Sequence, residues 1–161
     1  LQQGAVRLRS DVERKRLHGL APLDDSAALG LDIYTSAASR RTFAQLAAQA
    51  RALLAAGYPV IVDAAFLRRR ERDAFDALAR ELGLPFAILH CHADPDRLRE
   101  RVRQRRAAGG DPSEADPAVL ARQQQQAEPL APEEQERTLD LATDQAWDAP
   151  ALYRRWLSVQ A

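Results

Sequence analysis

The sequence predicts an α/β fold in which a parallel sheet is covered by helices on both faces. Three observations support this fold class. Apolar runs typical of strands alternate with segments of helical periodicity along the chain. The run 57–66 shows no polar alternation before its single acid, as expected for a strand buried on both faces. The helical segments carry apolar side chains at three- and four-residue steps.

Length and composition limit the number of domains and the kinds of partner that the protein can have. The chain has 161 residues, enough for one domain with a substantial core, and we expect a single domain over residues 1–161. Twenty-three basic and 23 acidic residues cancel, so no global field draws the protein to nucleic acid or membrane. Cys91 is the single cysteine, which excludes an intramolecular disulfide and fits a reducing cytoplasm. No apolar run approaches the roughly 20 residues that span a bilayer.

The chain is expected to open with a short strand over residues 5–9, followed directly by a helix. Ser10 and Glu13 have the spacing of a capping box, in which two side chains satisfy free N–H groups at a helix start. Glycine, proline and paired aspartates make residues 19–34 a loop. Ser36 or Ser39 is expected to cap the helix that follows this loop.

That helix leads into the apolar run. Gly57 is expected just beyond its end, and Pro59 prevents its continuation. The β-branched residues at 60–62 favour a strand on a crowded, pleated surface. Asp63 then lies at the carboxyl end of the strand, which is where open α/β sheets place their ligands.

The second half of the chain repeats the alternation of helices and strands. A helix over 68–82, a strand over 85–92 and a last strand over 138–142 extend the pattern and indicate right-handed βαβ units. Residues 128–134, with two prolines, are expected to form a loop. A terminal helix from Pro150 should pack on the domain through its apolar side chains, which are Leu152, Trp156 and Leu157.

Asp11 and Arg14 form the first candidate pair. They are expected in the first turn of a helix, one turn apart on the same side, just beyond the end of a strand. This placement suits a ligand site. In the alternative interpretation, Asp11 complements the helix dipole and Arg14 is solvated, and the local pattern alone favours this second view.

Asp63 has two interpretations that the apolar run supports equally. A buried strand that ends in aspartate is how many nucleotide-hydrolysing folds present a carboxylate to Mg²⁺. The same aspartate could instead cap the helix that follows. The pattern does not choose between them.

Residues 94–127 are predicted to form an arginine-rich, lid-like helical region. Asp94 and Pro95 are the expected N-cap and first residue of its helix. Arg101 and Arg105 lie on one stripe of that helix and could close over phosphate oxygens, which guanidinium groups bind through two parallel hydrogen bonds. The alternative is a solvated charged face. Glycines at 109–110 end the helix.

The adjacent His90, Cys91 and His92 invite a metal interpretation. In a strand the two histidines share a face and Cys91 points to the other. No second cluster of ligands with suitable spacing is present in the sequence, so we do not expect these three residues to form a metal site. Cys91 is expected to act as a small hydrophobic residue rather than as a nucleophile.

Three segments, at 5–18, 57–67 and 110–116, resemble P-loop kinases of the AAA-33 type, which are the zeta-toxin-like and polynucleotide-kinase-like ATP-binding domains. The Ser-Asp-x-x-Arg and Val-Ile-Val-Asp-Ala-x-Phe-Leu segments are weak alone and fairly specific together. The chain is most similar to the bacterial form often fused behind an aminoglycoside-phosphotransferase-like domain. The resemblance implies a three-layer parallel sheet, ATP and Mg²⁺ as cofactors, and transfer of a γ-phosphoryl group to a small-molecule or polynucleotide hydroxyl.

The resemblance also implies a role for each matching residue. Asp11 would accept the proton of the acceptor hydroxyl, and Arg14 would hold a substrate phosphate or orient Asp11. Asp63 would lie near Mg²⁺, directly or through water. Arg101 and Arg105 would be lid arginines that reach the transferring phosphoryl group. Such a set suits phosphoryl transfer, which depends on positioning and charge neutralisation more than on covalent chemistry.

One defining motif of the family is missing from the sequence. No Gly-x-x-x-x-Gly-Lys-[Ser/Thr] loop occurs, and the single lysine, Lys15, follows no glycine loop. We therefore expect either a fragment of a longer protein or a domain that has lost its P-loop, inactive as it stands. The alternative is a non-catalytic domain that binds a phosphorylated ligand or a protein partner.

The missing motif also affects the expected sheet. In the family the strand that leads into the P-loop lies in the middle of the sheet, so the strands around Val60 and Ile88 lack their shared neighbour. Unpaired backbone groups in an interior are costly. We predict that a strand is supplied from upstream or by a partner, or that the sheet is rearranged. Such open edges also favour homo-oligomers.

Overall fold

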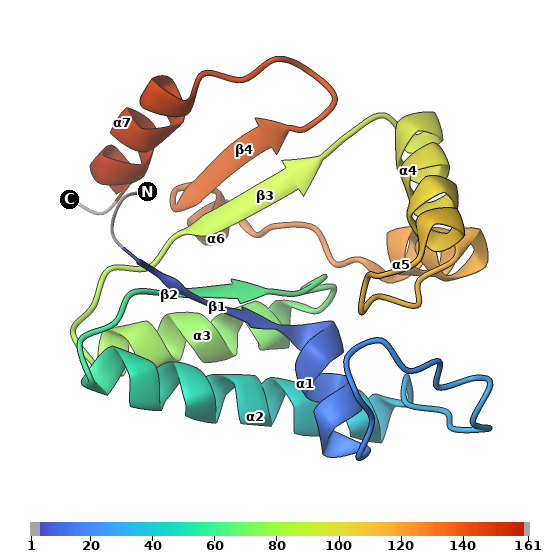
Figure 1. Cartoon of the computed structure of the whole chain (residues 1–161). Helices are drawn as coiled ribbons and strands as arrows, with labels where there is room; N and C mark the ends of the chain where they lie inside the picture. The colour runs from blue at the N-terminus through green and yellow to red at the C-terminus, as the bar shows by residue number, and fades with distance from the viewer. Residues whose placement is uncertain (1–3, 160–161) are drawn as a thin grey trace. The chain divides into compact units, whose positions relative to one another are not determined.

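The computed structural model describes residues 4–159 as a chain of alternating strands and helices, as predicted (Figure 1). The chain divides into two compact units. The first unit combines the residues up to Phe66 with Arg106–Ala115. The second combines Leu67–Arg105 with the residues from Asp116 onward. Each unit is described by itself.

The first unit is built on two parallel strands and two helices. Strand β1 (Val6–Arg9) runs directly into helix α1 (Ser10–Leu17), and helix α2 (Ser36–Ala55) leads to strand β2 (Val60–Asp63). The strands pair in register from Val6 opposite Val60 to Arg9 opposite Asp63. The carboxyl ends of both strands therefore lie at the same edge of the sheet, as a βαβ unit requires.

Both helices of this unit begin differently from the prediction. Helix α1 includes Ser10, and the residue before it, Arg9, makes no side-chain capping bond, so the predicted capping box is wrong. The carboxylate of Glu13 is buried and instead accepts hydrogen bonds from Arg16 and Gln49, which leaves it no role at the helix start. Helix α2 is capped by Thr35, one residue ahead of Ser36, through a 3.1 Å bond from the N–H of Ala38.

The core of the first unit lies under one face of its sheet. Ile33 and Leu46 are fully buried, and helix α2 contacts both strands. The other face is more open than the apolar run predicted, because the side chain of Ile61 is 45% exposed. Full coverage of β2 on both faces was therefore a wrong expectation within residues 4–159. Gly57 follows α2 with φ +85°, a conformation that glycine adopts without strain.

The second unit contains the remaining strands and most of the helices. Strands β3 and β4 pair in parallel, with Ile88 opposite Thr138 and His92 opposite Ala142. The bounds of its elements are α3 (Arg69–Glu81), β3 (Ile88–His92), α4 (Pro95–Ala108), α5 (Pro117–Gln126), α6 (Pro132–Gln135), β4 (Thr138–Ala142) and α7 (Ala149–Val159). The last turn of α4 belongs to the first unit.

Two details of the second unit differ from the prediction. The expected loop over 128–134 contains the start of the short helix α6, which the proline at its first position favours. Leu157 of helix α7 is 47% exposed and does not pack as expected, whereas Leu152 and Trp156 are partly covered.

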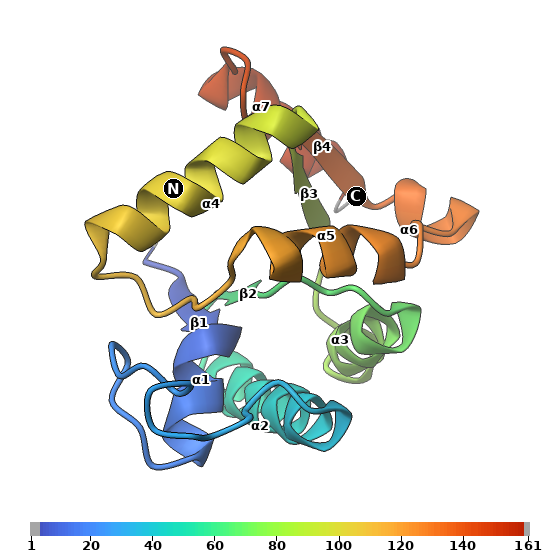
Figure 2. The same ribbon diagram turned by 90° about the vertical axis from the view of Figure 1, so that its right-hand side faces the viewer.

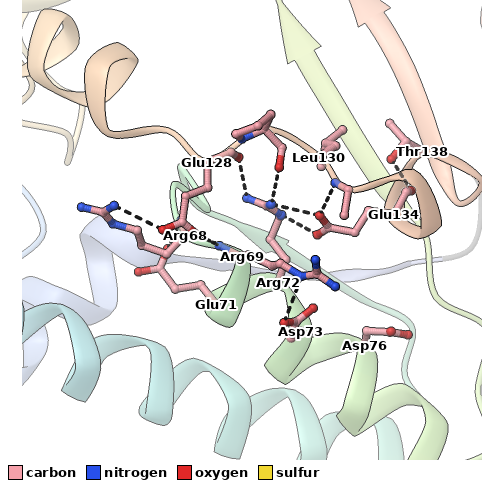
Figure 3. A network of polar contacts seen from close by, with 12 residues as sticks. Arg68, Arg69, Glu71, Arg72, Asp73, Asp76, Glu128, Leu130, Glu134 and Thr138 are labelled. Carbon is pink, nitrogen blue, oxygen red and sulfur yellow. Dashed lines mark hydrogen bonds and ion pairs between the residues drawn. The ribbon is translucent and has the colours of Figure 1, made fainter.

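A buried ion pair holds helix α3 to the segment that precedes β4 (Figure 3). The guanidinium of Arg72 donates to both carboxylate oxygens of Glu134, at 2.6 and 3.0 Å. It also donates to the backbone carbonyls of Glu128 and Pro129, both at 3.2 Å. Such a fork-to-fork pair fixes orientation as well as charge. Arg72 therefore ties four acceptors of one loop to helix α3.

The four strands form two separate two-stranded sheets, β1 with β2 and β3 with β4. Within residues 4–159, β2 and β3 do not pair with each other or with any third strand. This agrees with the expectation that the strands around Val60 and Ile88 lack a shared neighbour. Which segment completes the two sheets stays a prediction.

Across residues 4–159, no helix is both long enough and apolar enough to cross a membrane.

Candidate functional site

Asp11 lies in the first turn of helix α1, directly after strand β1. Its side chain is half-buried. Among the described residues, its carboxylate has no hydrogen-bond or ion-pair partner. A carboxylate that makes no hydrogen bond or ion pair within the protein can accept a proton from a bound hydroxyl.

Arg14 lies one turn further along the same helix and is almost completely buried, with 7% of its surface exposed. Its Nη1 donates to the carbonyl of Ile33 at 3.1 Å and to the hydroxyl of Ser39 at 3.3 Å. Its guanidinium carbon lies 5.0 Å from the centre of the Tyr34 ring, within the range of a cation–π contact. The Nε of Arg14 is buried and has no partner.

Tyr34 shows that Asp11 and Arg14 share one electrostatic environment. Burial raises the pKa of the Tyr34 hydroxyl to about 12, and the negative charges of Asp11 and Glu114 add to this effect. The positive charge of Arg14 partly offsets the rise. The phenol therefore stays protonated and neutral at physiological pH, as a ring that stacks on a guanidinium and can donate one hydrogen bond.

Asp63 ends strand β2 beside Arg9, its partner in the parallel register. Its Oδ2 accepts a hydrogen bond from the Nε of Arg7 at 3.1 Å and lies 3.5 Å from the Nε of Arg9. The side chain is 40% exposed. Asp63 is thus an accessible carboxylate at the carboxyl edge of the sheet, and two arginines of β1 balance its charge.

The surroundings of Asp63 do not suit a directly bound Mg²⁺. A divalent cation at its Oδ2 would lie against two guanidinium groups, and like charges at that separation repel. Within residues 4–159, no group of three histidine, cysteine, aspartate or glutamate side chains is arranged to hold a metal ion. Contact with the ion through a water molecule, also predicted from the sequence, avoids this direct repulsion.

The two lid arginines belong to the second unit and differ in their bonding. Arg101 donates to the hydroxyl of Thr143 at 2.7 Å and to its carbonyl at 2.8 Å, so its guanidinium ties helix α4 to the end of β4. Arg105 is half-buried and has no hydrogen-bond or ion-pair partner among residues 4–159. Of the pair, Arg105 is therefore the one whose guanidinium is uncommitted.

The histidines of β3 are engaged with the neighbouring strand. The Nδ1 of His90 lies 2.6 Å from the Oδ1 of Asp140, its partner in the register, and the rings of His90 and His92 are 5.6 Å apart. Both rings lie on the same face, as predicted from the alternation of a strand. Cys91 is exposed, unlike the buried small residue that was expected.

Asp11, Arg14 and Asp63 all lie in the first unit: Asp11 directly after β1, Arg14 one turn further along α1, and Asp63 at the end of β2. Arg101 and Arg105 come from the other unit. Sequence reasoning missed Tyr34, whose ring lies against Arg14, and Ser39, which was considered only as a helix cap. An aromatic residue at the end of a polar loop carries no sequence signal for this role, since the contact forms only when the loop folds back on α1.

Comparisons with known proteins agree on the family and the fold. The profile of a family described as an AAA domain, AAA-33, matches residues 1–130. A gluconokinase from Sinorhizobium meliloti 1021 has a similar structure, with a TM-score of 0.60 and 18% sequence identity over 98% of this chain and 75% of that one. No curated protein matches the sequence. The profile match over residues 1–130 shows that the chain belongs to the AAA-33 family of AAA domains, and its fold is similar to that of the gluconokinase.

Proposed function

We propose that this chain is the acceptor-binding and lid-bearing part of an ATP-dependent phosphotransferase. In the proposed reaction the acceptor oxygen forms a bond to the γ-phosphorus of ATP, the bond to the β–γ bridging oxygen breaks, and ADP leaves. Asp11 takes the proton of the acceptor hydroxyl. The observation that supports this best is the free carboxylate of Asp11 one helical turn from a buried arginine with an unsatisfied donor.

Arg14 is assigned to an anionic group of the acceptor. A buried donor without an acceptor costs about 1–3 kcal/mol, and an anion that reaches the guanidinium would relieve that cost. The bonds to Ile33 and Ser39 already fix the orientation of the guanidinium, so little conformational entropy would be lost on binding. An acceptor with a phosphate or carboxylate close to its reacting hydroxyl fits these properties.

The other candidate residues keep the roles that the family resemblance implies. Asp63 is proposed to act on Mg²⁺ through water, and Arg105 to neutralise charge on the transferring phosphoryl group. Arg101 is proposed for the same role, for which it would have to leave Thr143. The 161 residues contain no Walker A motif, so we propose that this chain alone does not hold the triphosphate and is inactive without such a loop. We place the protein in the cytoplasm, where ATP is available and Cys91 stays reduced.

The test is the loss of turnover when Asp11 is replaced. In a form of the protein that contains a P-loop, Asp11→Ala should lower kcat by about 10²–10⁴-fold, the usual contribution of a general base, and leave the affinity for ATP unchanged. Asp96→Asn is the control, since Asp96 is a highly exposed aspartate that pairs with Arg99 of its own helix. Unchanged turnover in Asp11→Ala would remove the base role.

A second measurement separates the kinase from the alternative of a non-catalytic domain. Calorimetric titration of the 161-residue chain with ATP and Mg²⁺ should show no saturable micromolar binding. If a form that contains a P-loop binds phosphorylated ligands but never transfers phosphate, the result would favour the non-catalytic alternative. Tight ATP binding by the 161 residues alone would contradict the proposed dependence on a Walker A loop.

A further inference from the structure

Glu114, in the segment that follows helix α4, lies at the centre of a buried polar cluster in the first unit. Its Oε1 accepts a hydrogen bond from the backbone N–H of Ser26 at 2.9 Å, and its Oε2 accepts one from the Ser26 hydroxyl at 2.5 Å. The Nζ of Lys15 lies 3.0 Å from Oε1. Lys15 and Ser26 are each only 2% exposed.

Lys15 depends on Glu114 for its counter-charge. Its two other bonds go to neutral acceptors, the backbone carbonyls of Pro22 at 3.1 Å and Asp24 at 2.7 Å. Among residues 4–159, Glu114 is the only carboxylate that pairs with this ammonium. A buried charge that loses its partner is strongly destabilising, so the contact between the loop and α1 requires Glu114.

The same loop ends at the proposed acceptor site. Residues 18–35 connect α1 to α2, and Lys15 and Glu114 hold the first part of this loop, at residues 22–26. The last part is held by Arg14, which bonds to the carbonyl of Ile33 and stacks on Tyr34. Arg14 and Lys15 are neighbouring residues of α1, so a shift at one end of the loop should displace the other end as well.

The segment that carries Glu114 is itself fixed at a second point. Asp111 accepts a hydrogen bond from Arg9 at 3.2 Å, at the end of strand β1. Gly109 and Gly110, both with positive φ, make the sharp turn between the end of α4 and this segment. The loop 18–35 and the turn after α4 can be followed within the first unit in Figure 2.

We propose that Glu114 is a positioning residue for the acceptor side of the site. By neutralising Lys15 and binding Ser26, it fixes the loop 18–35 on α1, and through that loop it sets Ile33 and Tyr34 around the guanidinium of Arg14. The effect on catalysis rests on the proposed function. The effect on the loop does not, and it can be measured without any activity.

The first experiment is amide hydrogen exchange, resolved by residue, on the 161-residue chain. Glu114→Gln keeps the shape and an acceptor oxygen but removes the charge that Lys15 needs. Exchange at Ser26 and at Leu31, whose N–H bonds to the Ser26 carbonyl, should accelerate at least about tenfold, while exchange in α2 stays unchanged. Glu133→Gln is the matched control, because it removes an exposed ion pair with Arg69 in the other unit.

A double variant tests whether the effect passes through Lys15. Lys15→Met combined with Glu114→Gln removes both charges, so the loop should regain most of its protection. If Glu114→Gln does not fold, the double variant should fold. Unchanged exchange in Glu114→Gln, an equal effect of Glu133→Gln, or a double variant no better than Glu114→Gln would each overturn the proposal.

Kinetics then separate positioning from general damage. In a form that transfers phosphate, Glu114→Gln should raise KM for the acceptor by more than it lowers kcat, and leave KM for ATP unchanged. An equal rise in both KM values would indicate a general structural defect and contradict the positioning role. If no phosphoryl transfer is detected in the wild type, the proposed function fails, and the exchange data still decide whether Glu114 holds the loop.

Discussion

At the scale of single residues, the charged side chains of α1 differ in their contacts. Arg14 and Lys15 are both buried, and both bond to carbonyls of the loop that follows the helix. Asp11, one turn earlier, keeps a free carboxylate. Two cations of the helix thus hold the loop, whereas the carboxylate of Asp11 is not used in such a contact. This division explains why a sequence interpretation that treats Arg14 as solvated is wrong.

The closeness of Asp11 to Tyr34 gives a prediction that needs no substrate. Because burial and the charge of Asp11 both raise the pKa of Tyr34 to about 12, Asp11→Asn should lower that pKa toward the ordinary value of 10.0. The measurement is an ultraviolet titration of phenolate absorbance, with Tyr34→Phe used to assign the signal. A titration that Asp11→Asn leaves unmoved would place Asp11 away from the ring.

At the scale of secondary-structure elements, Arg72 ties helix α3 to the segment before β4. Arg68, the residue before the helix, donates its backbone N–H to the side chain of Glu71 at 3.2 Å and its guanidinium to Glu128 at 3.3 Å. Arg72 bonds to four acceptors in residues 128–134 (Figure 3). Arg68 and Arg69 add bonds to Glu128, but among the residues described Arg72 contributes the buried ion pair to this proline-containing segment.

Arg72→Met should therefore destabilise the second unit strongly. Removing one partner of a buried ion pair typically costs about 3–5 kcal/mol, because the other charge is left unpaired. Arg80→Met, which removes an exposed guanidinium that pairs with Asp76, should have a much smaller effect, because solvent screens such pairs. Urea unfolding followed by tryptophan fluorescence reports on this unit, since Trp147 and Trp156 both lie in it. Equal effects of the two variants would contradict the role of Arg72.

The elements themselves were largely predictable because their signals are local. Strand β4 matches the predicted 138–142, and Asp116 caps α5 as its position before proline indicates. The errors lie where tertiary contacts override local preference. Glu13 was expected to cap α1, but the side chain of Gln49 on another helix binds it. The pair of Lys15 with Glu114 joins residues far apart in the sequence, and no periodicity reports such a contact.

At the scale of the whole molecule, each of the two-stranded sheets has two outer edges, and neither edge pairs with a further strand among residues 4–159. Large apolar side chains on the same strands are exposed, with Ile61 at 45% and Leu89 at 53%. Open edges with apolar side chains favour strand pairing with another chain. The family resemblance predicted the fold class and strands around Val60 and Ile88 without a shared neighbour, whereas the division into two units had no signal in the sequence.

These edges predict self-association of the 161-residue chain. Sedimentation velocity should show an average mass that rises with protein concentration. Ile61→Lys and Leu89→Lys should each reduce that rise, because a charge on an exposed strand opposes pairing. Leu23→Lys is the control, since Leu23 is equally apolar and 63% exposed but lies in a loop. A chain that stays monomeric at every concentration would contradict the prediction.

The discontinuity of the first unit has a consequence for biosynthesis. Its β1, α1, α2 and β2 leave the ribosome early, but Asp111 and Glu114 follow only after α3, β3 and all of α4 have been made. Until Glu114 emerges, the ammonium of Lys15 has no counter-ion among the described residues and cannot be buried at low cost. The nascent segment up to β2 should therefore remain incompletely folded during translation, and a chain truncated just before Glu114 should be degraded by proteases faster than the 161-residue chain.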